Sequence, residues 1–241
     1  MKRIFCYCRL LVVLASGCAH RDAETAVCNP YPLNMTFAVA PVLNFSGENY
    51  FDSLRAADLL ASELTYLQGV NVLPVSRVAA YLAAQGKVQI ESPAHALAVA
   101  DAVGADAIWI AGITEYDPYT PVVGLAIQVY MVPHTPSAGL DPFVAERLAQ
   151  PISLHSMTDA SLPRDQVQMV YNGTHANVAD AVKRFADPRK GSDSPLGWKE
   201  YLKVQSLFLR FCWHDAIERI TTQDRWSDAS PTPDKPTEQP I

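Results

Sequence analysis

Short apolar runs alternate along the chain with longer stretches in which apolar residues recur at helical spacing. Residues 35–43 form a continuous apolar run of a length typical of a buried strand. Turn residues follow at 44–49, and Asp52 can cap a helix whose leucines and alanines recur every three or four positions until Gly69. A buried strand followed by an amphipathic helix indicates an α/β fold.

The middle of the chain repeats this alternation. The predicted elements are a strand at 71–75, a helix at 76–85, a helix at 93–103, and strands at 107–113 and 122–132. We expect Ser76 to cap the first of these helices and Gly86 to stop it, and Ser92 and Gly104 to bound the second. Residues 116–121 contain two prolines, which remove donors from a strand ladder, so we expect a loop or hairpin connection there.

The last third of the chain predicts strands at 152–157 and 167–172, a helix at 176–186, a loop at 191–197 and a long helix at 198–220. The long helix is apolar over a wide surface, so it either packs on the sheet or offers part of that surface to a partner. The sequence therefore predicts one α/β domain at 35–222, with a mixed sheet of five or six strands flanked by helices. The Pro-rich residues 223–241 predict a disordered tail.

The N-terminus has the pattern of a bacterial secretory signal at residues 1–17. Positive charge precedes the apolar run at 10–15, and the small residues Ser16 and Gly17 precede Cys18. This pattern is typical of a lipobox, in which the Cys18 thiol carries a diacylglyceryl group and acyl chains such as palmitate. The alternatives are a plain signal peptide that is cut nearby and a short buried helix. Residues 18–34 would then be a linker between the lipid anchor and the domain.

Charge and composition narrow the possible ligands. The chain has 19 Lys and Arg residues against 25 Asp and Glu residues among 241 in all, a net charge of −6, so nucleic acid is not an expected partner. The charged residues at 1–17 are all basic, so the loss of this segment would make the chain more acidic. An acidic surface does not bind anionic lipid headgroups, so membrane attachment is expected through the acyl chains alone. Ala19, where aspartate would favour the inner membrane, favours the outer membrane on the periplasmic side.

Two cysteines remain once Cys6 and Cys8 have left with the signal and Cys18 carries lipid. Because an oxidising compartment favours pairing, we expect a disulfide bond between Cys28 and Cys212. Two alternatives stay open. Cys212 is a small buried hydrophobic residue, or it forms a nucleophile pair with His214, although residues two apart on a helix point in different directions.

Three segments together resemble a known group of proteins. They are AVAPVLNFSG at 38–47, VLPV at 72–75 and GADAIWIAGITEY at 104–116. In this order behind a lipobox, they resemble the periplasmic α/β domain of the curli-secretion lipoprotein family, the TolB N-terminal domain and lipoprotein activators of penicillin-binding proteins. The resemblance covers residues 36–132 and implies a mixed sheet with helices and a role in envelope assembly through protein contacts. Pore formation is not expected, because residues 124–131 lack the alternation of a membrane hairpin.

No motif for catalysis, metal or cofactor binding stands out. The histidines and the remaining cysteines show no metal-ligand spacing, and neither a nucleophile elbow nor a phosphate-binding loop occurs. We therefore predict no catalytic residue, no metal site and no cofactor. The favoured function is a non-enzymatic envelope protein that contacts other envelope proteins or a second copy; the alternative is a periplasmic enzyme such as a hydrolase. The aromatic residues at 116–121 either bind a peptide or glycan or pack locally.

Overall fold

The computed structural model describes residues 34–133, 162–189 and 194–227, with side chains up to residue 222. The strands are β1 (Met35–Val39), β2 (Leu43–Asn44), β3 (Val70–Val72), β4 (Ala107–Asp117), β5 (Val122–Met131) and β6 (Asp165–Asn172). The helices are α2 (Ser53–Leu64), α3 (Val75–Ala84), α4 (Pro93–Val103), α6 (Ala176–Ala186), the 3-10 helix η2 (Gly197–Leu202) and α7 (Gln205–Ser227). Among these helices, none has the length and apolar character needed to cross a membrane.

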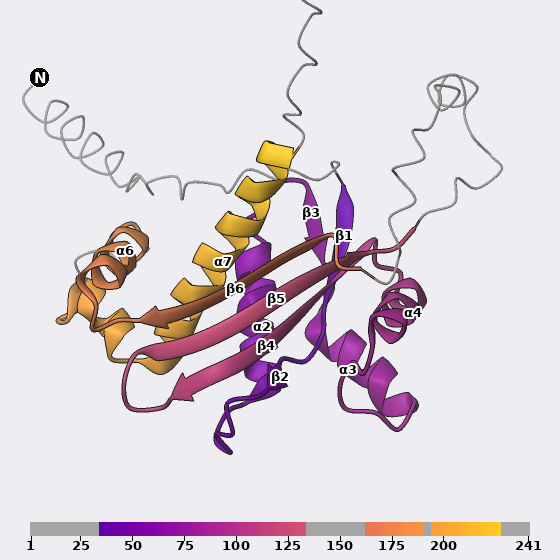
Figure 1. The fold of residues 1–241 in the computed structure, drawn as a ribbon, viewed down its shortest axis with the longest axis horizontal. Helices are drawn as coiled ribbons and strands as arrows, with labels where there is room; N and C mark the ends of the chain where they lie inside the picture. The colour runs from indigo at the N-terminus through magenta and orange to yellow at the C-terminus, as the bar shows by residue number, and fades with distance from the viewer. Residues whose placement is uncertain (1–33, 134–161, 190–193, 228–241) are drawn as a thin grey trace, which may run out of the picture.

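The strands form one mixed sheet in the order β3-β1-β4-β5-β6, with β2 paired to the far part of β4 (Figure 1). β1 runs parallel to β3 and β4, whereas β4, β5 and β6 are antiparallel to one another. This confirms the predicted α/β class and the mixed sheet flanked by helices. The strand predicted at 152–157 lies outside the described residues.

Helices cover both faces of the sheet. Trp109 and Ile113 of β4 pack in the larger core with α2, α6 and α7, while Ile108 and Ile110 pack in a second core with α3 and α4. This alternation follows from the period of two in a strand, where successive side chains point to opposite faces. The larger core contains most of the buried aromatic rings, and α7 contributes Phe208, Phe211 and Trp213 to it.

The predicted strand at 35–43 is two strands in the structure. Pro41 lies between them and has no N–H group to donate to a neighbouring strand. Ala40 N still donates to Trp109 O at 3.0 Å, but Val42 N donates to Ser53 O, away from the sheet. The chain leaves the ladder for three residues and rejoins it as β2.

Two helix boundaries also differ from the prediction. Helix α3 begins at Val75 after Pro74, and no side chain caps it, so the expected Ser76 cap is wrong. The long helix expected at 198–220 is divided into η2 and α7 near Lys203. The break lets Tyr201 of η2 pack edge-on against Phe185 of α6, with their ring centroids 5.6 Å apart.

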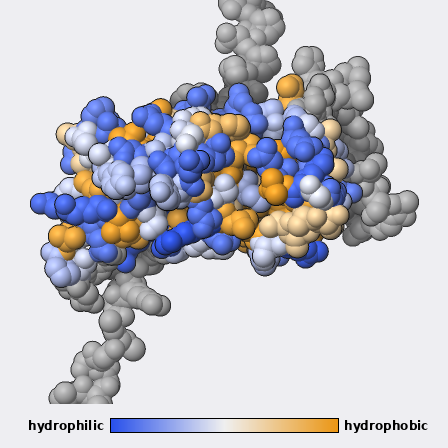
Figure 2. All heavy atoms as spheres, turned by 90° about the horizontal axis from the view of Figure 1, so that it is seen from below, coloured by the Kyte–Doolittle hydropathy of each residue, from blue (hydrophilic) through white to orange (hydrophobic). Residues whose placement is uncertain are grey.

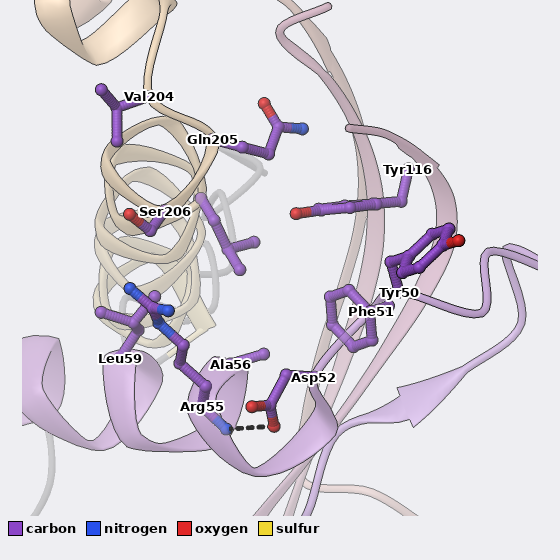
Figure 3. Close-up of a pocket in the computed structure, with 11 residues that line it drawn as sticks. Tyr50, Phe51, Asp52, Arg55, Ala56, Leu59, Tyr116, Val204, Gln205 and Ser206 are labelled. Carbon is purple, nitrogen blue, oxygen red and sulfur yellow. Dashed lines mark hydrogen bonds between the residues drawn. The ribbon is translucent and has the colours of Figure 1, made fainter. Parts of the chain in front are cut away.

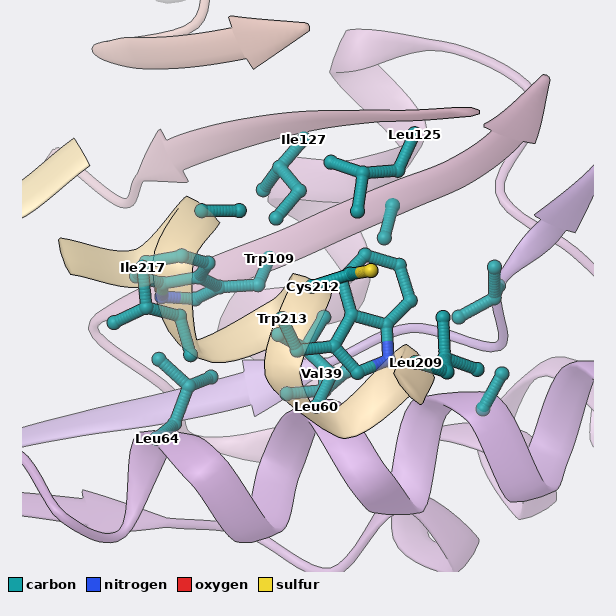
Figure 4. Close-up of a cluster of buried hydrophobic side chains, with 14 of the residues drawn as sticks. Val39, Leu60, Leu64, Trp109, Leu125, Ile127, Leu209, Cys212, Trp213 and Ile217 are labelled. Atoms are coloured by element: carbon teal, nitrogen blue, oxygen red, sulfur yellow. The ribbon is translucent and has the colours of Figure 1, made fainter. Parts of the chain in front are cut away.

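The apolar surface of α7 belongs to the core. Trp213 and Cys212 are fully buried, and Leu209 and Ile217 pack with Leu60 of α2 beneath the sheet (Figure 4). Of the two interpretations of this helix, the structure supports packing on the sheet. Most of this apolar surface is therefore not available to a partner, and only the start of α7 also lines a pocket.

Candidate functional site

A pocket of about 270 Å³ opens between the start of α2, the start of α7 and the end of β4. It is lined by Tyr50, Phe51, Asp52, Arg55, Ala56, Leu59, Tyr116, Val204, Gln205, Ser206 and Leu209, and we call it the aromatic pocket (Figure 3). It lies beyond the carboxyl ends of the parallel strands, where binding sites of open α/β sheets are commonly built. The fold therefore places this pocket where a ligand or partner is expected.

A network of local hydrogen bonds positions the aromatic residues on one side of the pocket. Asn44 Oδ1 accepts from Ser46 N at 3.1 Å, and Asn44 Nδ2 donates to Glu48 O at 2.8 Å. Tyr50 N in turn donates to Glu48 Oε1 at 3.0 Å. These bonds fix the turn between β2 and α2. The backbone that carries Tyr50 and Phe51 at the edge of the pocket is therefore ordered.

The cap of α2 completes this side of the site. Asp52 Oδ1 accepts from Leu54 N at 3.1 Å and from Arg55 N at 3.0 Å, which satisfies two amides of the first helical turn. This cap was predicted from the sequence and is confirmed. It holds the first turn of the helix, from which the Arg55 side chain extends toward the pocket (Figure 3).

The end of β4 and the start of α7 form the opposite walls. Phe51 and Tyr116 meet edge-on, with ring centroids 5.1 Å apart. Gln205 Nε2 donates to Asp117 O at 2.7 Å and so ties the first turn of α7 to the end of β4. Burial raises the pKa of the Tyr116 hydroxyl, while the Arg55 charge opposes this shift, so Tyr116 stays a neutral donor at physiological pH.

Two tyrosines, one in the pocket lining and one in the turn after β4, are exposed to an unusual degree. Tyr50 is 88% exposed and Tyr119, in the turn beyond Tyr116, is 94% exposed. Asp117 Oδ1 accepts from Tyr119 N at 2.8 Å, so the turn that presents this ring is ordered by its own hydrogen bonds. In the view of Figure 2, hydrophobic residues occur in several small groups between hydrophilic ones. Exposed aromatic residues on a fixed backbone are typical of protein-binding surfaces.

The predicted hairpin connection at 116–121 contributes to this site through Tyr116. The sequence prediction did not include Tyr50 or Arg55. The available signal was the pair Tyr50 and Phe51 directly before a capped helix. Two large rings between a polar turn and a helix cap must pack either in the core or against a partner.

The other predicted site residues fall elsewhere. Cys18 and Cys28 lie outside the described residues, and Cys212 is fully buried, which raises the pKa of its thiol. His214 does not approach this thiol as a base would. Its Nδ1 lies 3.3 Å from Glu63 Oε2, so its partner is on α2. Within the described ranges, no group of three or more His, Cys, Asp or Glu residues is arranged to hold a metal ion.

Comparisons with known proteins give fold neighbours only. No protein-family model and no curated protein matches the sequence. Among solved structures, the LpoB C-terminal domain from Salmonella enterica matches 42% of this chain and 74% of its own at 14% identity and a TM-score of 0.35. Lipoprotein GNA1162 from Neisseria meningitidis matches 42% of this chain and 72% of its own at 19% identity and a TM-score of 0.32. The hypothetical protein CT253 from Chlamydia trachomatis matches 80% of this chain and 99% of its own at 11% identity and a TM-score of 0.39.

These identities and scores do not transfer a function to this chain. They also do not show membership of the curli-secretion or TolB families, which stays an expectation from the sequence. The residues of the aromatic pocket and the N-terminal pattern are therefore the features that indicate a function.

Proposed function

We propose that this chain is a lipid-anchored protein of the bacterial envelope that faces the periplasm from the outer membrane. It acts without catalysis, by binding another envelope protein or a second copy through the aromatic pocket, in envelope assembly or secretion. The observation that carries this proposal is the pair of exposed tyrosines on ordered turns, Tyr50 in the lining of the pocket and Tyr119 in the turn that follows β4. The lipid anchor would hold the domain near the membrane, where such partners are found.

The chemistry of the pocket supports protein binding. Tyrosine rings bring a large contact area with few rotatable bonds, and arginine and tyrosine are enriched among the residues that dominate binding energies. A hydrolase, the alternative, would need a titratable group that a substrate can reach. Glu63, the buried carboxylate beside His214, is 1% exposed and lies away from the pocket lining, so this pair does not offer such a group.

The binding proposal is tested by site-specific photo-crosslinking in intact cells. A photoreactive amino acid at Tyr50 is expected to give one discrete product with another protein, or a product of twice the chain mass if the partner is a second copy. The same probe at Val88, which is 84% exposed and lies between α3 and α4, is the matched control and is expected to give none. Equal products at both positions, or none at Tyr50, would contradict the proposal.

The anchor is tested separately. Cys18→Ser removes the only acceptor that the lipobox offers, so the protein is expected to move from the membrane fraction to the soluble periplasmic fraction. Intact-mass analysis of the native protein should show a diacylglyceryl-modified and acylated N-terminus at Cys18. An unmodified N-terminus would show that the lipoprotein assignment is wrong.

A further inference from the structure

We infer that the aromatic pocket binds a carboxylate side chain from a partner segment, with Arg55 as its ion-pair partner. An apolar residue next to that Asp or Glu packs on the walls of the pocket. This inference deepens the proposed function and rests on it, because it names the chemistry of the partner at the same site.

The first observation is the state of Arg55. Its side chain is exposed and lines the pocket, and within the described part of the chain no carboxylate forms an ion pair with it. By contrast, Arg210 and Arg219 each hold a carboxylate. In a chain with a net charge of −6, an arginine directed into an aromatic pocket without a partner is suited to an acidic ligand.

The second observation is the balance of donors and acceptors in the pocket. Figure 3 shows the Tyr116 hydroxyl directed into the space from the side opposite Arg55, with the Ser206 hydroxyl at the start of α7. The one carboxylate in the lining, Asp52, already accepts from two amides of α2. Arginine donates only, and the positive end of the α7 dipole lies on the same side. The groups left for a ligand therefore favour an acceptor with negative charge.

The third observation is the size and lining of the pocket. Its volume of about 270 Å³ lies below the range of roughly 300–1,000 Å³ that is usual for small-molecule sites. Phe51, Leu59 and Leu209 supply apolar walls beside the donors. One charged side chain with one apolar neighbour fills such a space better than a cofactor does. Tyr50, exposed at the mouth, is then available to pack on the rest of the segment.

The inference is tested by NMR titration of the folded Cys18→Ser protein with two matched peptides at millimolar concentration. The peptides are acetyl-Leu-Glu-Phe-amide and acetyl-Leu-Gln-Phe-amide, which differ only in charge. The Glu peptide is expected to shift the backbone amides of Arg55 and Ser206 in a saturable way and to bind roughly tenfold more tightly than the Gln peptide. Arg55→Gln is expected to abolish this preference, whereas Arg77→Gln, an exposed arginine on α3, keeps it.

Equal binding of the two peptides, no shift with either, or an unchanged preference in Arg55→Gln would overturn the inference. Saturation of the same shifts by acetate alone at the same concentration would also overturn it, because the ligand would then be a free carboxylate. The crosslinking experiment distinguishes this failure from failure of the proposed function. If Tyr50 still gives its product in the Arg55→Gln protein at unchanged yield, protein binding stands and the carboxylate contact is wrong.

Discussion

Glu63 shows how a single residue ties two distant helices together. It lies on α2 with a fully buried side chain, and its Oε1 accepts from Arg210 Nε on α7. Arg210 also donates to the Tyr66 hydroxyl at 3.3 Å, and His214 Nδ1 lies 3.3 Å from the second carboxylate oxygen. A buried charge needs such partners, and since Oε2 makes no hydrogen bond with the described residues, it is the bond from Arg210 to Oε1 that ties α7 to α2. The walls of the aromatic pocket depend on that position.

Replacement of Glu63 is therefore expected to destabilise the fold. Glu63→Gln leaves Arg210 without its ion-pair partner and should lower the free energy of unfolding by about 2 kcal/mol, less than for a fully buried pair because Arg210 is partly exposed. Urea denaturation measures this change. Glu91→Gln, which removes the exposed pair with Lys87, is the matched control and should have little effect. Equal effects of the two substitutions would contradict the role given to Glu63.

Tyr171 gives a prediction at alkaline pH. Its hydroxyl donates to Asp215 Oδ2 at 2.8 Å, and burial, together with the Asp215 charge, raises its pKa well above the usual value. The native state therefore keeps a proton that the unfolded chain loses near pH 10, so stability is complete below that pH and falls as the pH rises. The expected loss approaches about 1.4 kcal/mol per pH unit for this group.

Substitution isolates this contribution. Tyr171→Phe should reduce the slope of unfolding free energy against pH above about pH 10. Tyr130→Phe should leave most of the slope, since burial alone raises the pKa of Tyr130 and no carboxylate adds to the shift. Denaturant unfolding between neutral and alkaline pH measures both slopes. A slope unchanged in Tyr171→Phe would show that this hydroxyl does not control alkaline stability.

At the scale of single elements, helix caps separate what sequence predicts well from what it does not. Ser92 caps α4 as expected, with its Oγ accepting from His95 N at 3.1 Å, and Gly104 ends that helix in the left-handed region at a φ of 77°. Ser76 has equal intrinsic ability to cap. It does not do so, because Pro74 fixes an extended backbone one step earlier and α3 starts at Val75.

This difference predicts opposite outcomes for two similar substitutions. Ser92→Ala should lower the free energy of unfolding by about 1 kcal/mol, because the His95 amide loses its acceptor. Ser76→Ala places a better helix former at an exposed position inside α3 and should be neutral or slightly stabilising. Thermal and urea unfolding of the two variants measure this contrast. A larger loss for Ser76→Ala would contradict the observed helix boundary.

The sheet and the helices were predictable because apolar periodicity is a local property of the chain. The aromatic pocket was not, because Arg55 and Ser206 meet only after α7 has packed on α2. The break between η2 and α7 was missed for the same reason. The break accompanies the packing of Tyr201 against Phe185, and no spacing along the sequence reveals this contact between helices.

For the whole molecule, the predicted bond between Cys28 and Cys212 would join the two ends of the domain. Cys212 is fully buried in the larger core, which agrees with its interpretation as a small buried hydrophobic residue. It is the one cysteine within the described residues, while Cys28, its expected partner, lies outside them. The bond between them therefore stays a prediction. It would require the segment before β1 to reach Cys212 beneath the sheet.

Such a bond would close a loop of most of the domain and should add about 2–5 kcal/mol to the free energy of unfolding. If it forms, Cys28→Ala should cost this amount in oxidising conditions and nothing after reduction. Cys212→Ala should add a further loss, because it leaves a cavity in the core in either condition. Thiol counting in denaturant without reductant, on the Cys18→Ser protein made without its signal and refolded in oxidising buffer, should find neither thiol. Two reactive thiols, with Cys28→Ala as stable as its parent, would show that the bond is absent and that Cys212 acts only through packing.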